Sequence, residues 1–141
     1  MRAVVFVVLA LAACATAPGD PAPQASPLAA QISADNARLD AELAASGMVT
    51  AGIGETADVG DGLTVKPLEV LEDSRCPMNV QCVWAGRVRL RAEVSGASQD
   101  FTLGEPLQTP QGTLTLAVVK PSAWAEWPGP RTPYRFGFRK G

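Results

Sequence analysis

The feature that most constrains the fold is a series of short segments in which apolar and polar residues alternate. The clearest spans residues 87–94, where Val88, Leu90, Ala92 and Val94 alternate with charged residues. Successive side chains of a strand point to opposite faces, so this pattern predicts a strand with one buried and one solvated face. Similar patterns predict strands at 55–59, 63–70, 100–103, 113–119 and 134–139.

Turn-forming residues separate these segments, among them Gly60-Asp61-Gly62 and Ser95-Gly96. Pro67 falls inside one expected strand and lacks an N–H, so we expect it at a sheet edge or a bulge. Short strands joined by regular turns are typical of antiparallel sandwiches and small barrels. We therefore predict an all-β domain over residues 48–141, a small antiparallel β-sandwich that is immunoglobulin-like or a small barrel.

A short helix is predicted at residues 33–47, just before the β domain. Ser33 is a plausible N-cap, Leu39 and Leu43 share one face, and Gly47 suits the position after the helix end. Residues 14–32 are rich in proline and alanine, which predicts a flexible, disordered tether.

The N-terminus has the pattern of an export signal. Arg2 is followed by an apolar run of eleven residues, which is far shorter than the roughly 20 residues of a membrane-spanning helix. The run ends in Leu11-Ala12-Ala13-Cys14, which resembles the lipobox of bacterial lipoproteins. The resemblance implies a signal peptide at 1–13 and an acylated Cys14 that anchors the protein in a lipid bilayer. The alternative is cleavage after Ala17, which releases a soluble secreted protein.

The same resemblance implies a location in the bacterial cell envelope. Gram-negative lipoproteins that stay in the inner membrane carry Asp after the acylated Cys. Here the residue is Ala15, which favours the outer membrane, facing the periplasm.

Composition excludes several classes of function. The chain has no histidine, so Ser-His-Asp and Cys-His catalysis and the usual histidine-based zinc sites are excluded. Its 12 basic and 14 acidic residues give no polybasic surface for nucleic acid. We expect no metal, no cofactor and no enzymatic activity; a small envelope hydrolase is a disfavoured alternative.

Residues 73–86 differ from the rest of the chain and read DSRCPMNVQCVWAG. They resemble a D-S-R-C-P-x-x-V-x-C-x-W-x-G signature of small exported bacterial proteins of uncharacterised function, many of them lipoproteins. With Cys14 acylated, Cys76 and Cys82 form an even pair in an exported chain, which predicts a disulfide. Trp84 follows Cys82 by two residues, so on an extended chain its indole is expected to pack on the bridge and join the core.

This segment has two interpretations. It is a structural staple, or it is a rigid loop that displays Met78, Asn79, Val80 and Gln81 to a partner, since preorganised loops lose little entropy on binding. A protease inhibitor that presents residues 76–82 is one form of the second interpretation. A redox role is disfavoured, because thiol oxidoreductases use C-x-x-C and here five residues separate the cysteines.

Two other groups of residues are candidate binding sites. Arg87, Arg89 and Arg91 form a basic row, which suits an anionic lipid or glycan, or is simply a solvated strand face. Trp124 and Trp127 lie in a proline-rich segment at 121–130, which suits glycan or peptide binding, or folds over the core as a seal.

Together these observations predict a membrane-anchored envelope lipoprotein with a non-catalytic binding or structural role. Beyond the bilayer, the expected partner is an envelope protein or a glycan.

Overall fold

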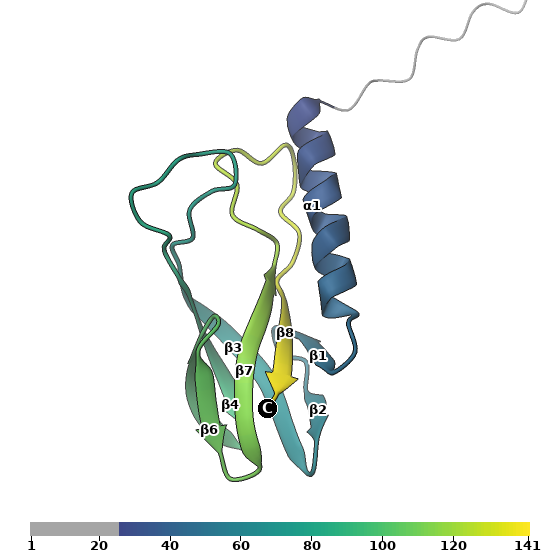
Figure 1. The fold of residues 1–141 in the computed structure, drawn as a ribbon, viewed down its shortest axis with the longest axis vertical. Helices are drawn as coiled ribbons and strands as arrows, with labels where there is room; N and C mark the ends of the chain where they lie inside the picture. Colours follow the sequence, from purple (N-terminus) through teal and green to yellow (C-terminus); the bar gives the residue numbers. More distant parts are fainter. Residues whose placement is uncertain (1–25) are drawn as a thin grey trace, which may run out of the picture.

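The computed structural model describes residues 26–141, which form two four-stranded antiparallel sheets and one helix (Figure 1). The elements are α1 (Pro27–Leu43), β1 (Met48–Gly52), β2 (Ala57–Gly60), β3 (Leu63–Asp73), β4 (Val88–Val94), β5 (Ala97–Thr102), β6 (Pro106–Thr109), β7 (Gly112–Lys120) and β8 (Arg135–Lys140). The strand orders are β1-β8-β7-β6 and β2-β3-β4-β5. The prediction of a small all-β sandwich is confirmed. The predicted signal peptide, Cys14 and tether residues 14–25 lie outside the described residues.

The core lies between the two sheets and follows the predicted alternation. All four apolar residues of β4 are buried, and they belong to one core cluster with inward side chains of β7 and β8 from the other sheet. Phe101 of β5 and Phe138 of β8 meet edge to face, with ring centroids 5.5 Å apart. Burying each large apolar side chain contributes about 1.5–3 kcal/mol, so this layer holds the two sheets together.

The strands differ from the prediction in two places. β1 and β6 were not expected, and both are short strands at sheet edges. Pro67 lies in β3, which pairs on both sides, and the register with β4 shifts between Pro67 and Glu69. The predicted bulge is therefore present, and it accommodates a residue that cannot donate to the ladder.

The helix begins at Pro27, so the predicted start near Ser33 and the extension of the tether to residue 32 are wrong. Ser26 is the N-cap, and its hydroxyl accepts a hydrogen bond from the Ala29 N–H at 3.2 Å. Proline is favoured in the first helical turn, where its missing N–H has no partner to lose. The Ser-Pro pair therefore marks the start of the helix.

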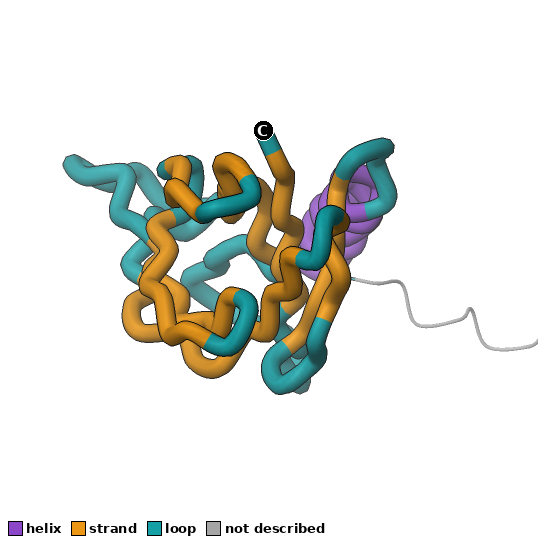
Figure 2. The backbone as a smooth tube through the Cα atoms, turned by 90° about the horizontal axis from the view of Figure 1, so that it is seen from below, coloured by secondary structure: helices purple, strands orange, loops and turns teal. Residues whose placement is uncertain are grey.

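The helix packs beside the sandwich. Leu39 and Leu43 bury against Val118 of β7 and Met48 of β1, and the Lys120 ammonium donates to Asp40 at 2.5 Å. Figure 2 shows α1 nearly end-on at one side of the strands, so its axis runs along the sandwich. No helix within residues 26–141 is long and apolar enough to cross a membrane.

One end of the sandwich carries both long loops. Residues 74–87 join β3 to β4, and residues 121–134 join β7 to β8. The helix also begins at this end (Figure 1). We call it the loop end.

Candidate functional site at the loop end

The first loop, residues 74–87, is a stiff extension of the β3–β4 hairpin, and we call it the stapled loop. At its base the Ser74 N–H donates to the Arg87 carbonyl at 2.9 Å, and the Cys76 N–H donates to the Ala85 carbonyl at 3.0 Å. The predicted disulfide between Cys76 and Cys82 closes the tip. These bonds pair the two arms of the loop well beyond the last residues of the strands.

Gly86 permits this close pairing. Its φ of +69° lies in the left-handed region, and a Cβ there would stand 1.7 Å from the Ser74 carbonyl oxygen. A side chain of any kind would collide with the opposite arm, so the base of the stapled loop requires glycine.

The second loop, residues 121–134, is joined to the first, and we call it the tryptophan loop. The Met78 N–H donates to the Ala123 carbonyl at 2.8 Å, and the Asn79 side-chain oxygen accepts from the Ala125 N–H at 3.1 Å. The stapled loop and the tryptophan loop, which the sequence analysis treats as separate candidate binding sites, therefore form one surface.

Arg75 connects the bases of both loops. Its guanidinium donates twice to the Asp73 carboxylate, at 2.8 and 2.7 Å. It also donates to the carbonyl of Val119 at 3.2 Å and to the carbonyl of Pro121 at 2.8 Å. A single side chain therefore links the end of β3 to the end of β7, and charge-assisted bonds of this kind are among the stronger ones in proteins.

Asp73 also binds the far end of the tryptophan loop, because the Tyr134 hydroxyl donates to it at 2.7 Å. Burial by itself would raise the pKa of Asp73. The hydrogen bonds from Arg75 and Tyr134, with the positive charge of Arg75, outweigh burial and hold the pKa below its ordinary value. Burial and the neighbouring Asp73 raise the pKa of Tyr134. Asp73 is therefore an ionised acceptor at neutral pH.

A cavity of about 390 Å³ opens between this polar cluster and the tryptophan loop. Its walls are Asp73, Arg75, Pro121, Ser122, Ala123, Trp124, Trp127, Arg131, Thr132, Pro133 and Tyr134. The volume is in the range of small-ligand sites, which combine aromatic walls with a few polar groups. Asp73 and Arg75 neutralise each other, and Arg131 leaves the lining with one positive charge, so the cavity suits a ligand with flat or weakly polar faces and hydrogen-bond acceptors.

The tip of the stapled loop is exposed to solvent. Exposed fractions are 58% for Met78, 47% for Val80, 92% for Val83 and 82% for Trp84. The expectation that Trp84 packs on the disulfide and joins the core is wrong. Residues 83 and 84 form a bend, so the same-face relation of an extended chain does not apply. Gln81 is exposed, as are Asn79 and Cys82.

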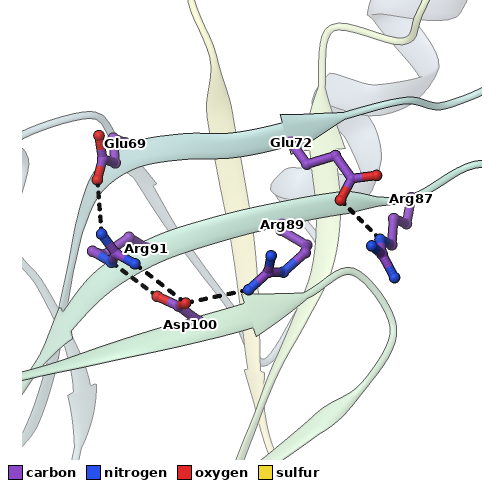
Figure 3. A network of polar contacts seen from close by, with 6 residues as sticks. All are labelled: Glu69, Glu72, Arg87, Arg89, Arg91 and Asp100. Atoms are coloured by element: carbon purple, nitrogen blue, oxygen red, sulfur yellow. Dashed lines mark hydrogen bonds and ion pairs between the residues drawn. The ribbon is translucent and has the colours of Figure 1, made fainter.

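Of the arginine row, Arg89 and Arg91 lie on β4 and Arg87 comes directly before it, and all three are paired with carboxylates (Figure 3). Arg91 bridges Glu69 at 3.1 Å and Asp100 at 3.0 Å. Arg89 contacts Asp100 at 3.3 Å, and Arg87 contacts Glu72 at 2.9 Å.

The pairing lowers the pKa of both Asp100 and Glu72, chiefly through hydrogen bonds from Arg91 and Arg87 respectively. Three guanidinium groups face three carboxylates, which favours a solvated strand face over an anion-binding site.

No protein-family model, curated protein or solved structure matches the chain. Within the part of the chain that the structure describes, no three His, Cys, Asp or Glu side chains gather in a way that could hold a metal ion.

Proposed function

We propose that this protein is a lipid-anchored binding module of the bacterial envelope, held by an acylated Cys14 in the outer membrane and facing the periplasm. Its binding surface is the loop end, and its partner is an envelope protein or a glycan. The observation that carries this proposal is the cavity of about 390 Å³ in the tryptophan loop, which Arg75 of the stapled loop helps to line, together with the hydrogen bond that joins the two loops. The anchor is supported by the lipobox-like Leu11-Ala12-Ala13-Cys14.

A purely structural role accounts for only part of this end. The disulfide, Gly86 and the Arg75 network all stiffen the loops, which a staple requires. A staple does not require a cavity walled by Trp124 and Trp127, nor a tip that exposes Val83 and Trp84 to water. Rigid aromatic surfaces bind well, because few rotamers are lost on association.

The chemistry of the cavity favours a sugar ring or a proline-containing peptide. Indole and phenol rings stack on the apolar faces of such ligands. Arg131 and Ser122 add hydrogen-bond donors to the lining. With no histidine in the chain, the histidine-dependent hydrolytic mechanisms are excluded, which supports a non-catalytic role.

The anchor is tested by Cys14→Ser. We expect an uncleaved precursor that incorporates no labelled fatty acid, whereas the wild type is processed and labelled. Normal processing of the variant, with cleavage after Ala17, would refute the anchor and leave a soluble secreted protein.

The binding surface is tested by Trp124→Leu, which keeps an apolar side chain but removes the stacking ring. In vivo cross-linking of the envelope should yield a partner with the wild type and lose it with this variant. The matched control is Ile53→Ser, an exposed apolar position outside both loops, which should keep the partner. Both variants must melt at the same temperature as the wild type, so that loss of the partner is not caused by unfolding. Survival of every cross-linked partner in Trp124→Leu would place the binding site elsewhere.

A second candidate function is protease inhibition. The observation that favours it is the exposure of Met78 and Val80 on a loop closed by a disulfide. Slow cleavage at the loop and stoichiometric inhibition in a panel of proteases would identify an inhibitor, and an absence of inhibition at micromolar protein would exclude one for the enzymes in the panel.

A further inference from the structure

The tip of the stapled loop gathers most of the exposed large apolar side chains of the described residues. Six such side chains are exposed in residues 26–141, and four of them lie between Met78 and Trp84. The other two lie outside this loop, Ile53 in the turn after β1 and Leu68 in β3. Residues 76–86 carry no charged side chain. The tip is therefore an uncharged apolar projection on a surface that otherwise has the usual mixture of charges.

The projection is held rigidly. The disulfide, the paired arms and the Met78–Ala123 hydrogen bond fix its position relative to the tryptophan loop. Exposed apolar surface is unfavourable in water, and a fixed tip loses little entropy when it docks. Burial of this rigid apolar tip in an apolar environment is therefore favourable.

The position of the N-terminus indicates what the tip meets. The helix begins at Pro27 at the same end of the sandwich as both loops (Figure 1). Twelve residue steps separate Cys14 from Ser26, and at roughly 3.3 Å per residue they span at most about 40 Å. An anchor at Cys14 is therefore attached to the domain at its loop end, and it keeps that end within about 40 Å of the bilayer.

We infer that the tip of the stapled loop, formed by Met78, Val80, Val83 and Trp84, inserts into the headgroup–acyl boundary of the bilayer that holds Cys14. This inference rests on the lipid anchor of the proposed function. Tryptophan is enriched at this boundary, because its ring is apolar and its N–H remains hydrated. An uncharged tip enters without the large cost of desolvating a charge.

Charges at the base of the loop limit the depth of insertion. Arg87 and Glu72 form an exposed ion pair below the tip, and Glu126 is exposed on the neighbouring loop. These groups stay in water, so only the tip enters the lipid. The membrane contact would then hold the cavity of the tryptophan loop close to the bilayer surface, where it would meet ligands attached to or lying near the membrane.

The test uses the full mature protein purified from its envelope and reconstituted in phosphatidylcholine vesicles, with and without brominated acyl chains that quench tryptophan. Intact mass first establishes that Cys14 carries acyl chains; an unacylated protein would overturn both this inference and the proposed anchor. In acylated protein, brominated lipid should quench wild-type fluorescence, and Trp84→Phe should remove most of the quenched component. Quenching that is the same in wild type and Trp84→Phe overturns the insertion and leaves the anchor intact.

A second pair of variants keeps Trp84 and changes its surroundings. Val80→Ser with Val83→Ser should reduce the quenching at least twofold, because the tip loses apolar surface. Ile53→Ser with Leu68→Ser removes the two other exposed apolar side chains and should leave the quenching unchanged. Equal reduction in both pairs would refute a specific role of the tip. A Trp84 emission shift that follows protein concentration in lipid-free detergent would instead indicate that the tip meets a second copy of the chain.

Discussion

The Tyr134 hydroxyl donates to the Asp73 carboxylate at 2.7 Å, across 61 residues of sequence. Asp73 is the last residue of β3, and Tyr134 is the residue before β8. This bond joins the two sheets at the loop end, beneath the cavity. Because the side chain of Asp73 is only 17% exposed and that of its partner Arg75 is 16% exposed, the cluster is sheltered from water and its geometry is well defined.

Tyr134→Phe should destabilise the domain while leaving its fold unchanged. The ring stacks on Phe136 with centroids 5.7 Å apart, and phenylalanine preserves that contact. The loss is confined to one hydrogen bond to a charged group, which is expected to cost about 1–2 kcal/mol. Urea unfolding measures the change. A variant as stable as the wild type would show that the bond contributes nothing net.

Asp73→Asn should produce a pH-dependent difference from the wild type. The pKa of Asp73 is lowered in the folded protein, so its stabilisation is fully present above the ordinary aspartate value of 3.8 and is lost as the pH falls through the lowered folded pKa. The variant should therefore melt below the wild type at pH 7, and the gap should narrow below about pH 4. Other carboxylates titrate equally in both proteins and cancel in the difference. A gap that stays constant from pH 7 to pH 2 would contradict the ionised role of Asp73.

The strands could be predicted where one face of a segment is buried and the other is solvated. β4 is the clearest example, because its charged residues face solvent and its apolar residues fill the core. β1 and β6 gave no such signal. β1 has five residues and β6 has four. Each is held in place by pairing with a longer strand, and the local sequence carries no information about that pairing.

The candidate site could be predicted only in part, for the same reason. The disulfide follows from the count of cysteines, and the two loops are marked by composition. Their joining depends on the Met78–Ala123 and Arg75–Pro121 bonds, which connect residues about 45 positions apart. The prediction that Trp84 packs on the disulfide is wrong, because a local bend, and not the residue spacing, determines where its side chain lies.

Replacing Cys76 and Cys82 together by serine should lower stability without unfolding the sandwich. The bridge closes a short ring, and on the loop-entropy model its loss costs about 2–2.5 kcal/mol. The core between the sheets contains neither cysteine, so the cooperative unfolding transition should remain. Alkylation with peptide mapping should leave both cysteines of the wild type unlabelled until reduction. Labelling of both in the native protein would contradict the staple.

Gly86→Ala should be the most damaging single methyl addition at the loop end. The new Cβ would stand 1.7 Å from the Ser74 carbonyl oxygen, and φ is +69°. Backbone strain and overpacking together are expected to cost about 3–5 kcal/mol.

Gly96→Ala is the matched control, because φ there is +86° and nothing lies within 4 Å of the added atom. It should cost only the left-handed backbone term, about 1–2 kcal/mol. Urea unfolding of both variants separates the two effects, and limited proteolysis within 74–87 should accelerate only in Gly86→Ala. Equal stability of the two variants would mean that the arms of the stapled loop move apart freely, which the paired hydrogen bonds at its base argue against.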